Sequence, residues 1–180
     1  MIFQNWGSSK EEIDGDVVGD DLCPSAHVSA TRSITITAPP DEVFPWIRQM
    51  GFGRAGWYSY DWLDNLGRKS ATSIHEEWQT IKSGDLIPAG PISFVAAIVE
   101  PSRAFVLEIK TGNKEHPRLH FTLAYELRPV DVGTRLVTRM RSNIAIPGGS
   151  LFERFVLGPG DGLMVRRQLL NVASRINRAT

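Results

Sequence analysis

Three segments in the second half of the chain alternate apolar with polar residues, the pattern of β-strands that are buried on one face. They cover residues 105–110, 119–128 and 135–141, and a similar segment runs from Ala30 to Thr37. In the longest of them the apolar positions are Leu119, Phe121, Leu123, Tyr125 and Leu127. An antiparallel sheet with one apolar and one charged face accounts for this pattern. The apolar face then requires a cover.

That cover is predicted at the C-terminus. From Leu163 the sequence becomes helical, and one side of the helix is apolar, with Val165, Leu169, Leu170, Val172, Ala173 and Ile176. Two short helices are predicted after the first strand, in residues 41–50 and in residues 58–66. The second would place Tyr58, Trp62 and Leu66 on one side. This order of elements predicts an α+β fold.

The chain of 180 residues suits one domain. We expect this domain at residues 28–180, preceded by an irregular acidic arm at residues 1–27. A short helix is expected in the arm, because Ser9 and Glu12 have the spacing of a capping box.

Charge is unevenly distributed although the net charge is zero. Residues 1–26 carry six acids and one lysine, whereas residues 135–180 carry eight arginines and two acids. Either the basic segment meets an anionic or membrane partner, or the arm lies against it, and we favour the second interpretation. Arg135, Arg139 and Arg141 are expected on the solvent face of the sheet, opposite Glu126 or Glu108.

Gly51, Gly53 and Gly56 form a G-x-G-x-x-G sequence, and Glu76 lies where a ribose-binding acid would be. A dinucleotide site needs a strand before the first glycine and a helix after the last. Here the preceding segment is a predicted helix. We therefore interpret the glycines as a sharp turn between two helices.

Several function classes lack support. Cys23 is the single cysteine, so no intrachain disulfide forms and a reducing compartment is expected. The N-terminus has no signal-peptide pattern and no apolar run is long enough to span a bilayer, so we expect a cytoplasmic protein. Zero net charge argues against a nucleic-acid partner. No cofactor is indicated. The sequence has no G-x-S-x-G nucleophile elbow, so nucleophilic catalysis has no support.

A metal site is not expected either. His116 and His120 would share a strand face but lie about 13 Å apart, from a rise near 3.3 Å per residue. Their face is expected to be the charged, solvent-exposed one. His75 is followed by Glu76 and Glu77, but no further ligand has a suitable spacing.

Three stretches resemble one protein superfamily: ITITAPPDEVFPWIRQMGFGRAGWYSYDWLDNL at 34–66, EEWQTIKSGDLIP at 76–88 and VEPSRAFVL at 99–107. They are similar to bacterial members of the START-like, or SRPBCC, superfamily, which includes polyketide cyclases and pollen-allergen-like proteins. The resemblance covers roughly residues 28–178. It implies a helix-grip fold, in which a curved antiparallel sheet wraps the C-terminal helix and leaves a cavity. The superfamily shares a fold and a pocket but no single catalytic set.

The aromatic stretch 57–62 is either core or cavity wall, with Trp57 and Tyr60 turned toward a ligand. Arg166 falls within the apolar arc of the last helix, where it would clamp a carboxylate or phosphate. The alternative, which we favour, is that it pairs with an internal acid or extends to the surface near the start of the helix. Tyr125, Thr138 and Ser142 supply hydroxyls on the apolar sheet face, which would orient a ligand or, for Thr and Ser, bond the neighbouring backbone. The expected ligand-binding residues are Arg54, Trp57, Tyr60, Trp62, Phe105, Phe121, Tyr125, Thr138 and Arg166.

Binding of a small, mostly hydrophobic molecule (a lipid, polyketide or aromatic metabolite) is the function that we expect. One alternative is a cyclase- or dehydratase-like enzyme on the same cavity. Tyr60, Asp61 or His75 would then transfer protons, and Arg54 or Arg166 would stabilise an oxyanion. The other alternative is an interaction protein whose basic strand meets an acidic partner. The sequence does not decide the oligomeric state.

Overall fold

The computed structural model describes residues 4–112, 117–145 and 158–179. Within these ranges, six strands form one antiparallel sheet in the order β1-β6-β5-β4-β3-β2. The strands are β1 (Val28–Ile36), β2 (Leu86–Pro88), β3 (Ser93–Glu100), β4 (Ala104–Gly112), β5 (Pro117–Val130) and β6 (Gly133–Ile144). The α-helices are α1 (Lys10–Asp14), α2 (Pro40–Arg48), α3 (Asp61–Asp64) and α5 (Gly158–Ala179), and 3-10 turns lie at Asp20–Leu22 and Glu76–Trp78.

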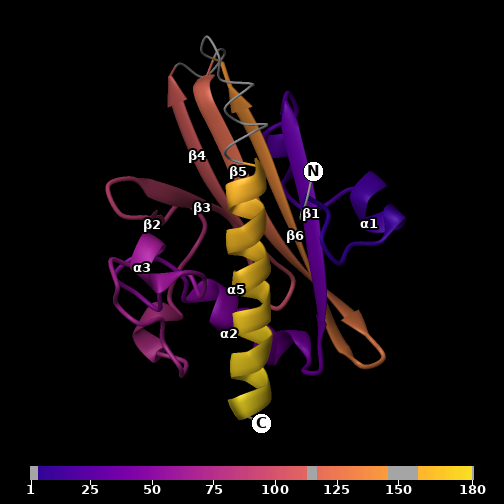
Figure 1. Ribbon diagram of the computed structural model, residues 1–180, viewed down its shortest axis with the longest axis vertical. Coiled ribbons are helices and arrows are strands. Elements are labelled where there is room, and N and C mark those ends of the chain that lie inside the picture. Colours follow the sequence, from indigo (N-terminus) through magenta and orange to yellow (C-terminus); the bar gives the residue numbers. More distant parts are fainter. Residues whose placement is uncertain (1–3, 113–116, 146–157, 180) are drawn as a thin grey trace.

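The predicted alternation decides which face of the sheet is covered. Tyr125 of β5 lies opposite Phe105 of β4 and Thr138 of β6, and Leu123 lies opposite Leu107 and Met140. All of these side chains are buried, and the apolar ones form one core with Val165, Leu169, Val172 and Ile176 of α5. Figure 1 shows α5 running lengthwise along the sheet. The α+β helix-grip architecture is therefore confirmed, although α5 begins at Gly158 rather than Leu163.

Helix α2 begins as predicted with Pro40 in its first turn, where the missing N–H costs nothing. Pro45 lies inside this nine-residue helix. The side chains of Val43, Phe44, Trp46 and Ile47 are buried in the core.

The second helix is much shorter than predicted. Only the single turn α3 forms, because Tyr58 and Leu66 have positive φ values of 56° and 50°. A left-handed residue cannot continue a right-handed helix. The predicted apolar side is therefore wrong: Tyr58 is fully buried, whereas Trp62 and Leu66 are 72% and 76% exposed.

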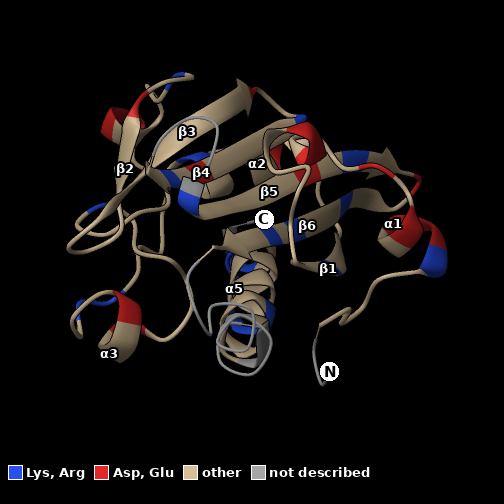
Figure 2. Ribbon diagram, turned by 90° about the horizontal axis from the view of Figure 1, so that it is seen from above, with Lys and Arg blue, Asp and Glu red and all other residues tan. Residues whose placement is uncertain are grey.

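The N-terminal arm (residues 4–27) covers the outer face of the sheet. Its capping box forms as predicted, with the Ser9 N–H and the Glu12 carboxylate 2.8 Å apart. Val17 of the arm packs with Val106, Ala124 and Val137 in a second apolar cluster. Figure 2 shows α1 and α3 at opposite sides of the molecule, so the arm lies far from the segment that carries α3.

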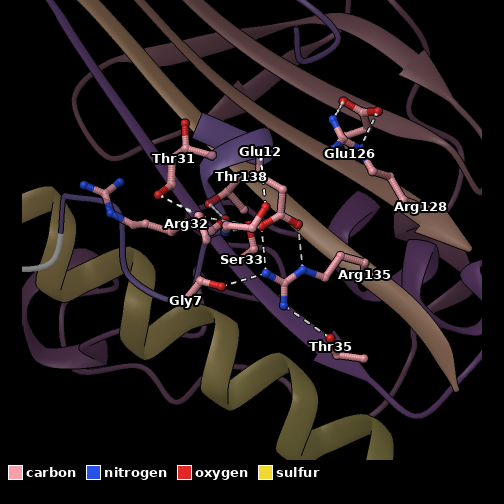
Figure 3. A network of polar contacts seen from close by, with 12 residues as sticks. Gly7, Glu12, Thr31, Arg32, Ser33, Thr35, Glu126, Arg128, Arg135 and Thr138 are labelled. Carbon is pink, nitrogen blue, oxygen red and sulfur yellow. Dashed lines mark hydrogen bonds and ion pairs between the residues drawn. The ribbon is translucent and has the colours of Figure 1, made fainter. Parts of the chain in front are cut away.

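Arginines on β6 hold this arm, so the prediction that they face solvent is wrong. Arg135 donates hydrogen bonds to Glu12 at 2.7 and 2.8 Å and to the Gly7 carbonyl, as Figure 3 shows. The Arg135 guanidinium lowers the pKa of Glu12 to about 2. Arg139 is 4% exposed and bonds Asp20 at 2.6 Å and three arm carbonyls. The arm therefore lies against the basic strand of its own chain.

The expected partners on the sheet are also different. Glu126 accepts hydrogen bonds from Arg128, two residues along β5, at 3.0 and 3.3 Å (Figure 3). Glu108 pairs with His120 at 2.7 Å. His120 is buried rather than solvent-exposed, and His116 lies outside the described residues.

Candidate functional site

A cavity of about 470 Å³ lies between the sheet, α5 and the segment that carries α3. The sheet contributes Phe94 of β3 with Phe121 and Leu123 of β5. Helix α5 contributes Met164, Val165 and Gln168. The rest of the wall comes from Phe52, Trp57, Ser59, Leu63, Asp64, Leu66 and residues 89–92. Most of these side chains are apolar.

Aromatic rings form a continuous part of the wall. The Trp57 and Phe94 ring centroids are 5.7 Å apart at an interplanar angle of 69°. The Phe94 and Phe121 centroids are 6.0 Å apart at 45°. Edge-to-face and tilted contacts of this kind stabilise the positions of the rings. The wall is therefore held in place by the protein itself.

Gln168 fixes the aromatic segment to α5. Its side-chain amide N–H donates to the Trp57 carbonyl at 2.8 Å, and its amide oxygen accepts from the Tyr125 hydroxyl at 2.8 Å. Ser59 donates to the Met164 carbonyl at 3.1 Å, and Asn171 donates to the Tyr58 carbonyl at 2.7 Å. Three side chains thus anchor residues 57–59 to one helix, which positions the Trp57 ring.

The glycine motif makes the turn that leads into this segment. Gly51 and Gly56 form an antiparallel bridge, each N–H donating to the other's carbonyl at 3.1 Å. Gly56 has φ of 75°, and a Cβ there would lie 2.4 Å from the Ser70 hydroxyl oxygen. Helix α2 precedes the motif, so the interpretation as a turn is confirmed.

Exposed apolar side chains mark where the cavity reaches the surface. Leu63, Leu66 and Ile92 all line it and are 53%, 76% and 53% exposed. They come from α3, the residues after it and the turn between β2 and β3. An apolar molecule entering the cavity would pass between α3 and this turn.

Asp64, the last residue of α3, is the one charged residue among the described residues of the wall. Both of its carboxylate oxygens are shielded from solvent, and neither has a well-formed hydrogen bond to any described residue. Burial, together with the nearby charge of Asp61, raises the pKa of Asp64 to about 6. The backbone N–H groups of Asp64 and Tyr60 offset part of this increase in pKa.

Of the predicted ligand-binding residues, Trp57 and Phe121 line the cavity. Tyr125 lies behind the wall and acts through its bond to Gln168. Phe105 is fully buried in the core, and the Thr138 hydroxyl donates to the Arg32 carbonyl at 3.1 Å.

The other four predicted ligand-binding residues lie elsewhere. Arg54 donates to the backbone carbonyls of Arg48, Gln49 and Trp78. The Arg166 guanidinium lies 5.2 Å from the Trp6 ring centroid, and the Arg167 guanidinium lies 6.0 Å from that of Tyr60. Trp62 is 72% exposed. Arg54 therefore holds the loop between α2 and α3, and Arg166 contacts the N-terminal arm. Tyr60 contacts Arg167, and Trp62 lies on the surface.

The catalytic candidates do not converge. Asp61 accepts hydrogen bonds from the Ser70 N–H at 3.1 Å and from its hydroxyl at 2.5 Å, which closes the loop after α3. His75 stacks on Trp78 at a centroid distance of 4.4 Å and lies 3.4 Å from a Glu77 oxygen. Neither lines the cavity. In the described ranges, no three His, Cys, Asp or Glu side chains are grouped to hold a metal ion.

Sequence reasoning missed Phe94, Asp64 and Gln168. Gln168 had a detectable signal, because a polar residue beside Val165 and Leu169 on a buried helix face needs internal partners. Phe94 begins the apolar run FVAAIV, whose composition does not indicate which face is covered. The predicted helix placed Asp64 on the same side as Trp57 and Tyr60, but Asp64 was not selected as a site residue.

Comparisons with known proteins support the fold. No protein-family model matches the chain, and no curated protein matches it. The crystal structure of MLL2253 from Mesorhizobium loti is 15% identical with a TM-score of 0.52, and the match covers 85% of this chain and 99% of that one. NE0264 from Nitrosomonas europaea is 11% identical with a TM-score of 0.53, over 86% and 97%.

A third structure is described as that of a Polyketide_cyc-like protein, Cgl2372 from Corynebacterium glutamicum. It is 16% identical with a TM-score of 0.40, and the match covers 83% of this chain and 91% of that one. At 15% and 11% identity, the likeness to MLL2253 and NE0264 concerns the fold alone. The chain has the helix-grip fold implied by its resemblance to the START-like superfamily. Among the described residues, no helix is both long and apolar enough to cross a membrane.

Proposed function

We propose that the protein binds a small, mostly apolar molecule in the cavity between the sheet, α5 and the α3 segment. The observation that carries the proposal is the aromatic wall of Trp57, Phe94 and Phe121 around a space of about 470 Å³. Sites for small molecules typically have volumes of about 300–1,000 Å³, mainly apolar walls and few polar groups. The exposed leucines and Ile92 at the surface give such a molecule a route inward.

The alternatives have less support. An acid–base enzyme needs two groups within reach of one substrate, but Tyr60, Asp61 and His75 all lie outside the cavity lining. An interaction protein that uses the basic β6 strand would have to displace the N-terminal arm, which already occupies Arg135 and Arg139. Ligand binding in the cavity needs neither a convergent acid and base nor displacement of the arm.

The test is a titration with prodan, a neutral apolar fluorophore whose emission shifts when it leaves water. Trp57→Leu removes an aromatic ring from the wall and retains an apolar side chain. Trp62→Leu removes the exposed tryptophan, five residues away, and serves as the matched control. We expect Trp57→Leu to weaken prodan binding by about fivefold or more, because buried aromatic contacts dominate binding energies. Trp62→Leu should leave the affinity unchanged.

Thermal melts of both variants separate binding from folding. The proposal is supported if Trp57→Leu stays folded at the assay temperature and loses affinity. It is wrong if the wild-type protein does not bind prodan, or if both tryptophan variants weaken binding equally. Equal weakening would place the fluorophore on the outer surface rather than in the cavity.

A further inference from the structure

Asp64 is the unusual residue in the wall of this cavity. The other polar side chains of the lining are Ser59 and Gln168, and both already have protein partners. Asp64 has none of comparable quality among the described residues, and both of its oxygens are shielded from water. A water-shielded carboxylate that has only weak backbone N–H contacts is costly unless a proton or a ligand neutralises it. A ligand that donates a hydrogen bond to Asp64 would remove this free-energy cost and would therefore bind more tightly.

The surrounding charges do not relieve the cost. Asp61, one turn earlier in α3, is an anion and increases it. No Lys, Arg or His belongs to the lining that the structure describes, whether from α5, from β3 and β5 or from residues 89–92. Arg167 of α5 lies over the Tyr60 ring instead. Among the described lining residues, a ligand carboxylate or phosphate would thus meet an anion and no cation.

We propose that Asp64 recognises the polar end of the bound molecule, which is a small, mostly apolar compound with one hydrogen-bond donor, an amine or a hydroxyl, and not a carboxylate. This inference rests on the proposed function. An amine gains most, since a charge-assisted hydrogen bond is stronger than a neutral one. The raised pKa of Asp64 fits the same picture, because burial and the charge of Asp61 destabilise its anion, which a ligand cation would stabilise.

The position of Asp64 also permits the contact. Its oxygens are covered by neighbouring atoms, so the side chain must rotate to face the cavity. No protein hydrogen bond of normal geometry has to break for this rotation, within the described residues. Asp61, three residues earlier, anchors the turn to Ser70 by two hydrogen bonds and holds α3 in place meanwhile.

Three matched probes test the proposal at pH 7.5: 4-butylbenzylamine, 4-butylbenzyl alcohol and 4-butylbenzoate, each competing with prodan. They share one apolar body and differ in the polar end. We expect the wild-type protein to bind the amine most tightly and the benzoate least, with about a tenfold difference between amine and benzoate. Asp64→Asn should weaken amine binding by about tenfold and reduce the ratio of amine to benzoate affinity accordingly.

Two further variants sharpen the result. Asp64→Ser repeats the loss of charge with a smaller side chain. Asp131→Asn removes an exposed acid in the β5–β6 turn and should not alter the order of the probes. Equal affinities for amine and benzoate in the wild-type protein, or an unchanged ratio in both Asp64 variants, would overturn the inference while prodan binding upheld the proposed function. Failure of prodan and all three probes to bind would overturn both.

Discussion

Replacing Asp64 by Asn should stabilise the protein near neutral pH and have little effect at pH 4. The pKa of Asp64 is raised from its usual 3.8 to about 6, chiefly by burial. The folded state therefore holds the proton more tightly than the unfolded state does. The stability that this proton contributes is fully present below pH 3.8 and is lost as the pH rises to about 6. Asn has no proton to lose, so it avoids this loss.

The magnitude follows from the pKa difference. A difference of about 2 pKa units corresponds to about 3 kcal/mol at most. Because the side chain is only partly buried, solvent screening reduces this figure, and we expect about 1 kcal/mol. The gain of Asp64→Asn over the wild-type protein should thus grow by about 1 kcal/mol between pH 4 and pH 7.

Urea unfolding of the wild-type protein and of Asp64→Asn at pH 4, 5, 6 and 7 measures this change. The difference between the two proteins cancels every other titration, including that of Glu12. Asp131→Asn is the control and should follow the wild-type protein. If Asp64→Asn shows the wild-type pH dependence, or becomes less stable than the wild-type protein above pH 6, then Asp64 is paired and the reasoning about its burial is wrong.

Three other outcomes are expected. Arg139→Gln should lower the free energy of unfolding by about 3 kcal/mol, since it leaves buried acceptors of the arm unpaired. Arg103→Gln, in an exposed ion pair, should lower it by less than about 1 kcal/mol. Equal losses of the two variants in urea unfolding would refute the role of Arg139 in holding the arm. Gly56→Ala should destabilise more than Gly53→Ala, because both have positive φ but only the first Cβ would clash; thermal melts with the reverse order would contradict this. Titration calorimetry with NAD should give no heat of binding, and a micromolar dissociation constant would disprove the interpretation of the glycine motif as a turn.

Regular periodicity accounts for what the sequence predicted well. Period-two alternation in β4, β5 and β6 and the apolar arc of α5 specify a sheet covered by a helix. These patterns are local, and burial on one face is their direct cause. Phe121 could be placed on the covered face of the sheet for the same reason. For Trp57 the sequence left core and cavity wall open as alternatives.

Features that depend on a few tertiary contacts could not be predicted. The left-handed backbone at Tyr58 prevents the expected helix from beginning there. The Tyr58 ring is held by an edge contact with Trp46 and by the Gln49 amide, which donates to its hydroxyl at 2.6 Å. The arginines of β6 were assigned to solvent because the alternation is the same whether water or an acidic arm covers that face. Asp64 was missed because its burial follows from where α3 ends.

The central claim, that an apolar molecule occupies the cavity, is tested most directly by isotope-filtered nuclear Overhauser spectroscopy of the labelled protein with 4-butylbenzyl alcohol. This experiment reports which side chains lie within about 5 Å of the probe. The account predicts cross-peaks from the probe's ring protons to the Trp57 indole and the Phe121 ring, which line the cavity. Cross-peaks only to the exposed Trp62, or none at all, would contradict it.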